Sequence, residues 1–330
     1  MTRATSPSPT PVSSPEVHPH AVFERLVENV EVVLRGKRDK VHLAVACLLA
    51  GGHLLIEDNP GTGKTSLARA LAASIGGTAR RIQFTPDLLP SDVTGVTIFD
   101  PRGNEFRFRP GPVFAHVVVA DEINRASPKT QAALLEVMEE RQVTVDGVAH
   151  PVPRPFLVVA TQNPLDLHGT YPLPEVQLDR FALKIGLGYA DRAAELEVMA
   201  GRTGTDPVAG LRPVIGAARL ARVVEAVRSV AVGELVREYV ADVVERTRSH
   251  RDLRLGVSTR GTLTLLAVAR AHAVGRGRSF VSPDDVKAVI RPVLAHRIAV
   301  TSEAELDGIG EAEVLDRILD AVPVPRLRAK

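Results

Sequence analysis

Strand-like runs and helical periods alternate over the first 190 residues of the chain. Short runs, most of them apolar, cover residues 53–57, 80–84, 116–120, 156–160 and 181–185. Between them, apolar residues recur at steps of three and four, which predicts helices over residues 21–34, 39–50, 64–75 and 128–140. Strands that alternate with helices in this way indicate a parallel sheet covered on both faces. We therefore predict an α/β domain from residue 21 to residue 190.

Two segments interrupt this alternation and have the pattern of β-hairpins. Residues 96–99 and 105–108 would form the arms of the first, which turns through polar and chain-breaking residues. Residues 142–145 and 149–152 would pair across Asp146-Gly147, a dipeptide that favours tight turns. We expect the first hairpin, part of an inserted segment over residues 85–115, to be presented on the surface.

From about residue 191 the pattern is helical only. Helical periods cover residues 193–201, 217–230, 234–249, 259–274 and 283–298. A chain of 330 residues also exceeds one comfortable hydrophobic core, so a second domain is the natural expectation. We therefore predict a second, all-helical domain over residues 191–322.

The two ends of the chain contain few residues that a core could bury. Residues 1–20 are rich in Pro, Ser and Thr and are predicted to be a disordered tail, and residues 323–330 a short second tail. Residues 1–20 also lack the apolar segment of a signal peptide. The most membrane-like stretch, residues 41–56, is too short to cross a bilayer. Neither a signal peptide nor a membrane span is therefore expected.

Composition limits the classes of partner. The chain has 41 basic and 39 acidic residues, and aromatic residues make up 4% of it. This balance gives no electrostatic reason for binding nucleic acid, and stacking platforms for bases are scarce. The single cysteine, Cys47, cannot form an internal disulfide, which fits a reducing cytoplasm.

Candidate chemistry begins directly after the strand predicted at residues 53–57. There the chain forms a Gly- and Pro-rich turn followed by a helix, a pattern that cradles phosphate groups on backbone N–H groups. Lys64 would reach the β- and γ-phosphates and the Thr65 hydroxyl would hold Mg²⁺. The alternative is an ordinary Gly-rich turn with a surface lysine. The candidate nucleotide-binding residues are Asp58, Asn59, Pro60, Gly61, Thr62, Gly63, Lys64, Thr65 and Ser66.

Two later strands end in polar residues at the same edge of the predicted sheet. Asp121 and Glu122 follow the run at 116–120; Asp121 would hold Mg²⁺, and Glu122 would polarise the water that attacks the γ-phosphate. Asn163 follows the run at 156–160 and can hydrogen-bond that water and the γ-phosphate. The alternatives are an acidic helix start and an Asn-Pro turn.

These motifs, in this order, resemble the AAA+ ATPases and, more closely, the MoxR family within them. The resemblance covers about residues 21–320 and includes the specific run 83–95, Gln-Phe-Thr-Pro-Asp-Leu-Leu-Pro-Ser-Asp-Val-Thr-Gly. It implies a P-loop α/β core, with a parallel sheet between helical layers, and a helical lid domain. It also implies that Asp58, where the general phosphate-loop consensus has Gly, is usual for such loops. Segment 85–115 then corresponds to the helix-2 insert of this clade, which lies near the pore of a ring.

The same resemblance assigns roles to single residues. Asn163 matches the residue called sensor 1, and Gly36 matches a position that approaches the adenine. Arg180 looks like the arginine finger that reaches the nucleotide of a neighbouring subunit, and Arg260 looks like sensor 2 of the lid. Arg125 is a further candidate for contact with a neighbour. Without the resemblance, Arg180 reads as a salt bridge to the preceding Asp179, and Arg260 as a helix-start residue on a solvated face.

Family membership further implies Mg²⁺-dependent ATP hydrolysis by a ring, expected to be a hexamer, that remodels or matures a client protein. Proteins of this family commonly work with a partner that carries a von Willebrand factor A domain. A nucleic-acid motor or loader is the main alternative. A GTPase is disfavoured because no Asn/Thr-Lys-x-Asp guanine motif occurs, and a scaffold without turnover is disfavoured by the Asp121-Glu122 pair. No His-Glu-x-x-His spacing predicts zinc.

Overall fold

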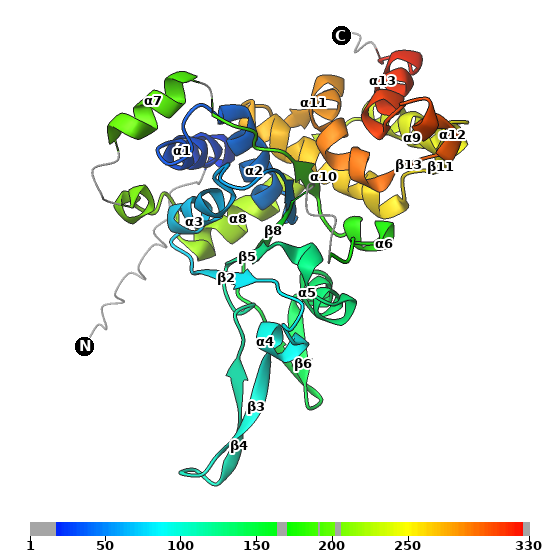
Figure 1. Cartoon of the computed structure of the whole chain (residues 1–330). Helices are drawn as coiled ribbons and strands as arrows, with labels where there is room; N and C mark the ends of the chain where they lie inside the picture. The colour runs from blue at the N-terminus through cyan, green and yellow to red at the C-terminus, as the bar shows by residue number, and fades with distance from the viewer. Residues whose placement is uncertain (1–17, 164–169, 191, 202–205, 326–330) are drawn as a thin grey trace, which may run out of the picture.

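The computed structural model describes residues 18–163, 170–190, 192–201 and 206–325. Its centre is a five-stranded sheet in the order β2-β5-β8-β1-β9, and all neighbouring strands are parallel (Figure 1). The strands are β1 (Leu54–Glu57), β2 (Ala79–Gln83), β5 (Val117–Asp121), β8 (Leu157–Gln162) and β9 (Leu183–Ile185). The predicted parallel α/β sheet is confirmed.

Alternate residues of each buried strand enter two different hydrophobic cores. In β1, Leu54 and Ile56 face one core and Leu55 faces the other. The first core packs against α1 (Pro19–Glu31), α2 (Arg38–Leu49) and α3 (Lys64–Ser74), and the second against α5 (Pro128–Glu140). Both faces of the sheet are therefore covered, which explains why the strands read as nearly continuous apolar runs.

The inserted segment forms a short helix and a long hairpin that extends away from the sheet (Figure 1). Helix α4 (Pro90–Thr94), which the sequence reading did not predict, leads into β3 (Gly95–Asp100) and β4 (Glu105–Pro110). The second hairpin pairs β6 (Gln142–Val145) with β7 (Val148–Pro151). The Phe108 ring stacks on the His150 ring at 4.1 Å between centroids, so the hairpins support each other.

Helices dominate the rest of the chain, as predicted, and the described residues there form more helices than the five that the sequence predicts. The helices are α6 (Glu175–Leu178), α7 (Arg192–Gly201), α8 (Ala217–Arg228), α9 (Glu234–Ser249), α10 (Thr259–Gly275), α11 (Pro283–Leu294), α12 (Ser302–Leu306) and α13 (Glu311–Ala321). Two short 3₁₀ helices, η2 (Pro207–Gly210) and η3 (Ala295–Arg297), also lie in this part, and a third, η1 (Ile123–Arg125), follows β5.

Two details of this helical part differ from the prediction. The helix expected over 283–298 ends at Leu294 and continues as η3, while Pro292 lies within its last turn. Two short strand pairs also tie the helices together: β10 (Ala231–Val232) with β12 (Phe280–Val281), and β11 (Leu253–Leu255) with β13 (Ala299–Val300). Strands of two or three residues are too short for a periodic signal.

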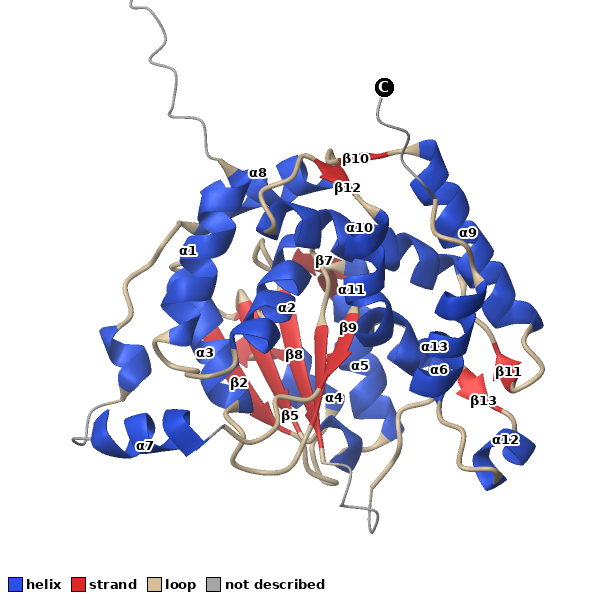
Figure 2. Cartoon of the chain, turned by 90° about the horizontal axis from the view of Figure 1, so that it is seen from above, coloured by secondary structure: helices blue, strands red, loops and turns tan. Residues whose placement is uncertain are grey.

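The helical part packs against the N-terminal helices, with α10 beside α1 and α2 (Figure 2). A Cβ added at Gly275 of α10 would lie 2.7 Å from both the Phe23 ring of α1 and the His42 ring of α2. Residues of α1, α2, β1, α10 and α11 share one continuous core. The boundary near residue 190 therefore stays a prediction, because hydrophobic contacts cross it.

The chain ends fall mostly outside the described residues. Helix α1 already begins at Pro19, so the predicted tail over 1–20 is too long by two residues, and residues 1–17 lie outside the described part. Of the second predicted tail, residues 326–330 lie outside it as well. Across the described ranges, no helix has both the length and the apolar character that crossing a bilayer requires.

Candidate functional site

The loop between β1 and α3 has a backbone that only glycine adopts readily at two positions. Gly61 has φ of 84° and Gly63 has φ of 97°, both in the left-handed region. A Cβ on Gly61 would meet nothing within 4 Å, so the backbone conformation, not crowding, requires glycine there. Helix α3 then begins at Lys64, and its N-terminal N–H groups face the loop.

The Lys64 ammonium lies over this loop. Its Nζ donates to the backbone oxygens of Asp58 at 2.7 Å and of Asn59 at 3.1 Å. The Asp58 carboxylate in turn accepts from the Asn59 N–H at 2.9 Å and from the Gly188 N–H at 2.6 Å. Asp58 therefore fixes the loop to the segment that follows β9, a structural reason for an acid at this position.

Asp121 and Glu122 lie at the C-terminal end of β5, next to the end of β8. One Asp121 oxygen accepts from the Thr161 hydroxyl at 2.6 Å, and the same hydroxyl accepts from the Glu122 N–H at 2.9 Å. Glu122 has φ of 55°, a left-handed conformation that turns the chain sharply after β5. Its carboxylate accepts from Gln83 at 3.0 Å and from Arg125 at 2.9 Å.

The phosphate loop and the Asp121-Glu122 pair line the same cavity, of about 360 Å³, at the C-terminal edge of the sheet. Its lining residues are Pro60, Gly61, Gly63, Lys64, Thr65, Ser66, Arg81, Asp121, Glu122 and Asn163. Nine of these ten residues were predicted from the sequence, and the structure brings them together from the loop, β5 and β8. We call this cavity the phosphate pocket.

Arg81 is the member of the phosphate pocket that the sequence reading missed. Its guanidinium donates to the second Asp121 oxygen at 2.5 Å and 3.1 Å. The sequence gives only a weak signal for Arg81, because a basic residue on a strand is common. Only the β2–β5 register places Arg81 beside Val119, two residues from Asp121.

The oxygen donors in the pocket fit a hard divalent cation. The Thr65 hydroxyl and the Asp121 carboxylate both line it, and Mg²⁺ prefers such ligands together with substrate phosphate oxygens. Within the described ranges, no group of three or more His, Cys, Asp or Glu side chains could hold a metal ion by itself. A cation here would therefore depend on the phosphates of a nucleotide.

Gly36 lies in the turn between α1 and α2, near the phosphate loop but outside the lining of the phosphate pocket. The residue after it is buried: Lys37 is 9% exposed and donates to the backbone oxygens of Thr62 at 2.8 Å and Gly188 at 2.6 Å. Burial lowers the pKa of Lys37, and the charge of Asp58 partly opposes that shift. Sequence reading missed Lys37, which joins the α1–α2 turn to the loop.

Arg180 and Arg260 lie in a different cavity of about 260 Å³. Arg180 pairs with Glu139 at 3.1 Å, and Arg260 pairs with the other oxygen of the same carboxylate. The structure does not bring Arg260 into the phosphate pocket of its own chain, because α10 packs on α1 and α2 and starts beside the segment before β9. The alternative of an Arg180–Asp179 salt bridge is wrong.

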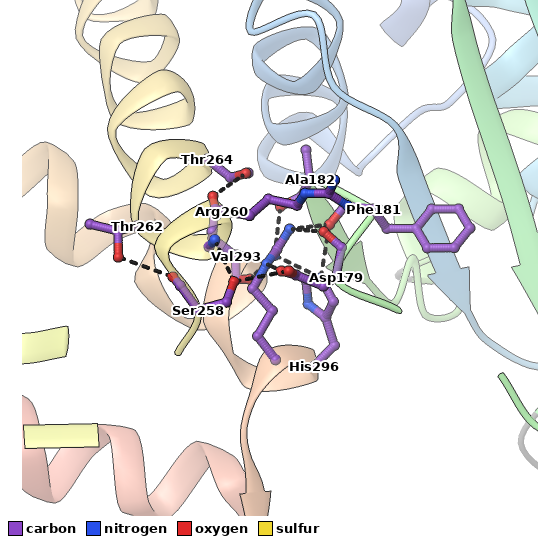
Figure 3. Close-up of polar contacts among 11 residues, drawn as sticks. Asp179, Phe181, Ala182, Ser258, Arg260, Thr262, Thr264, Val293 and His296 are labelled. Carbon is purple, nitrogen blue, oxygen red and sulfur yellow. Dashed lines mark hydrogen bonds and ion pairs between the residues drawn. The ribbon is translucent and has the colours of Figure 1, made fainter. Parts of the chain in front are cut away.

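Asp179 instead pairs with a buried arginine from the helical part. Arg297 is 4% exposed, and its Nε donates to Asp179 at 2.7 Å. Figure 3 shows Asp179, Ser258 and Arg260 drawn together from separate segments, with the Ser258 hydroxyl donating to Asp179 at 2.9 Å. Burial lowers the pKa of the Arg297 guanidinium, and the charge of Asp179 opposes the shift.

Two family models match the chain. The model of the ATPase family associated with various cellular activities (AAA) matches residues 53–183, which contain all the lining residues of the phosphate pocket. The AAA lid domain model matches residues 245–318, within the helical part. A crystal structure of a candidate ATPase from Cytophaga hutchinsonii superposes with a TM-score of 0.86 at 35% identity, over 93% of this chain and 96% of that one.

Sequence relatives cover nearly the whole chain. It is 46% identical over 310 residues to the uncharacterized protein YeaC of Bacillus subtilis, covering 94% of this chain and 97% of that protein. It is 41% identical to Chaperone MoxR1 of Mycobacterium tuberculosis, covering 95% and 84% respectively. It is 31% identical to Protein MoxR of Paracoccus denitrificans, covering 93% and 97%. With this sequence similarity over the same fold and phosphate pocket, the chain belongs to the MoxR family of AAA ATPases.

Proposed function

We propose that this ATPase hydrolyses Mg·ATP within a ring, with each phosphate pocket completed by arginines of the next subunit. The proposal rests on the finding that the predicted catalytic residues lie in two separate cavities. Lys64, Glu122 and Asn163 line the phosphate pocket, whereas Arg180 and Arg260 line the separate cavity. Any contact of Arg180 or Arg260 with a γ-phosphate must therefore be made on another copy of the chain or after a large rearrangement.

Within the phosphate pocket, each side chain has a distinct role. Thr65 and Asp121 would hold Mg²⁺, which neutralises charge on the phosphates. Lys64 leaves its contacts with loop carbonyl oxygens to bind β- and γ-phosphate oxygens. Glu122 orients and polarises the attacking water, and Asn163 hydrogen-bonds that water without adding charge. Gly36 and Lys37 place the α1–α2 turn against the loop, on the side where an adenine would bind.

The two arginines supply charge stabilisation across an interface. In other phosphate-loop enzymes a cationic finger contributes about 10³–10⁵ in rate. Arg180 and Arg260 share one carboxylate and are 27% and 45% exposed, so both heads are accessible to a neighbour. We infer that Arg260, which the resemblance matches to sensor 2 of the lid, contacts the nucleotide in trans beside Arg180.

The proposed biological role rests on the family. One relative is named a chaperone, and we propose the same class of work here: remodelling or maturing a client protein in the cytoplasm. A hexamer and a partner with a von Willebrand factor A domain belong to the same proposal. A nucleic-acid motor is less well supported, because the net charge is only +2 and two relatives matched over more than 90% of this chain are named MoxR1 and MoxR.

The test is Glu122→Gln, which removes the carboxylate but keeps the size of the side chain. We expect equilibrium binding of a fluorescent ATP analogue to stay within about 3-fold of the parent, while phosphate release falls by about 100-fold or more. Glu238→Gln, an exposed residue of α9, is the matched control. Normal turnover by the Glu122→Gln protein would remove Glu122 from the catalytic machinery. The same variant, loaded with ATP, is the reagent for isolating a client.

A further inference from the structure

Glu139, near the C-terminal end of α5, joins the half-buried Arg180 and the exposed Arg260 outside the phosphate pocket. One of its oxygens lies 3.1 Å from Arg180 Nη2, and the other forms an ion pair with Arg260 Nη2. The three residues come from three separate elements: α5, the segment between α6 and β9, and the first turn of α10. One carboxylate therefore neutralises two guanidinium groups that belong to different parts of the fold.

The backbones that carry these arginines are fixed by a second carboxylate, that of Asp179, which pairs with the buried Arg297. Asp179, directly before Arg180, accepts from Arg297 Nε at 2.7 Å and from the Ser258 hydroxyl at 2.9 Å. Ser258 is the N-cap of α10, and its hydroxyl accepts from the Gly261 N–H at 3.0 Å. Figure 3 shows this cluster, in which Asp179 links the segment before β9 to the start of α10.

Arg297 strengthens this link, since it also donates to the backbone oxygens of Phe181 at 2.5 Å and of Asp179 at 3.1 Å. A multiply hydrogen-bonded charge pair with a buried guanidinium is costly to break, because the buried charge would be left without its partner. The positions of the Arg180 and Arg260 backbones therefore do not depend on Glu139. Only the directions of their side-chain heads do.

The ion pairs made by Glu139 are of the weak, exposed kind. The side chains of Glu139, Arg180 and Arg260 are 36%, 27% and 45% exposed. Pairs in such surroundings contribute little to stability, because water and salt screen them. A γ-phosphate carries more charge than one carboxylate and can bind a guanidinium through two oxygens, so it can displace Glu139 from both arginines.

We propose that Glu139 is a positioning residue that holds Arg180 and Arg260 together as a latch until the nucleotide of a neighbouring subunit displaces it. This inference rests on the proposed action of both arginines in trans. The carboxylate occupies the two cations in a subunit without an ATP-loaded neighbour. It therefore competes with the phosphates for them, and part of the affinity for ATP at each interface is used to open the latch.

The test is Glu139→Gln, which keeps the shape of the side chain and removes the competing charge. In assembled protein, we expect the KM for ATP to fall by about 3- to 10-fold, with kcat within about 2-fold of the parent. A fluorescent ATP analogue, titrated into the same variant in the Glu122→Gln background, should show the same tightening without turnover. Glu140→Gln, which removes an exposed charge at the next position of the chain, is the matched control.

The outcomes separate the latch from the proposed function. If Glu139→Gln leaves KM unchanged, or lowers kcat at constant KM, the latch is wrong. If Glu139→Gln still tightens binding of the fluorescent ATP analogue in the Arg180→Ala, Arg260→Ala double variant, the latch is also wrong, because no cation remains to release. If that double variant by itself retains parental turnover, the trans arginines of the proposed function fail instead.

Discussion

Arg81 occupies the Asp121 oxygen that a divalent cation would need. Its guanidinium is 55% exposed, whereas the Asp121 side chain is 14% exposed, so the arginine can leave while the carboxylate stays in place. The pair keeps the charge of Asp121 balanced in the protein without nucleotide. Mg²⁺, if bound as proposed, would then compete with Arg81 for one carboxylate.

We therefore expect Arg81→Gln to lower the Mg²⁺ concentration needed for half-maximal ADP binding, by about 3-fold. Titration of Mg²⁺ against a fluorescent ADP analogue measures this directly, without turnover. Arg80→Gln, the neighbouring basic residue that does not line the phosphate pocket, is the control. An unchanged midpoint, or a higher one, would show that Arg81 does not compete with the cation.

His42 couples the stability of the helical part to pH. Its ring lies 4.5 Å from the Phe23 ring and 5.3 Å from the His272 ring, between centroids. Burial, followed by the charges of His272 and of Arg276 and Arg38, lowers the pKa of His42 from 6.5 to about 4. The charge of Asp39 partly opposes that shift.

Because the folded-state pKa is below the unfolded value, the unfolded chain binds more protons between pH 6.5 and about 4. The contribution of His42 to stability is thus complete above about pH 6.5 and is lost as the pH falls toward 4. We expect the free energy of unfolding of His42→Gln to fall less steeply over this range, as followed by urea denaturation. His250→Gln in the helical part is the control, and equal slopes would contradict the prediction.

At the scale of elements, the projecting hairpin depends on Gly95 at its base. Gly95 has φ of 99°, and an added Cβ would lie 2.4 Å from the Arg109 oxygen and 2.5 Å from the Gly111 N. Both the conformation and the space exclude other residues. The far end of the hairpin has few contacts with the sheet and ends in a Phe99–Phe106 pair with ring centroids 5.3 Å apart.

Gly95→Ala should therefore loosen the hairpin and leave the rest of the molecule folded. A strained left-handed residue with a steric clash costs about 1–3 kcal/mol. We expect amide hydrogen exchange in β3 and β4 to accelerate by about 10-fold or more, with a melting temperature close to that of the parent. Gly210→Ala, where an added Cβ meets nothing within 4 Å, is the control. Unchanged exchange in β3 and β4 would contradict the assignment of Gly95.

At the scale of the whole molecule, hydrolysis is expected to require two copies of the chain. Lys64→Ala should lose nucleotide binding, because the loop then lacks its cation, and Arg180→Ala should bind ATP but turn over about 10³-fold more slowly. When the two inactive proteins are mixed, some interfaces combine an intact phosphate pocket with an intact Arg180. ATPase activity of the mixture should partly recover, and well-mixed assemblies without recovery would contradict action in trans.

The local sequence determined most of the phosphate pocket. Strand β1, the two left-handed glycines, the start of α3 and the Asp121-Glu122 pair all depend on neighbouring residues, so short motifs predict them. The same holds for the hairpins and for the Ser127 N-cap of α5, whose hydroxyl accepts from the Thr130 N–H at 3.4 Å. Parallel strands then bring their C-terminal ends to one edge, which gathers the pocket.

Only the tertiary structure decided where the two arginines lie. The docking of α10 on α1 and α2 rests on contacts such as that of Gly275 with Phe23 and His42, which join residues far apart in the sequence. That docking places Arg260 beside Arg180 and Glu139 and leaves the phosphate pocket without either arginine. The contacts of Arg81, Lys37 and Arg297 are also long-range. No local pattern encodes such contacts, because their geometry depends on how whole elements pack.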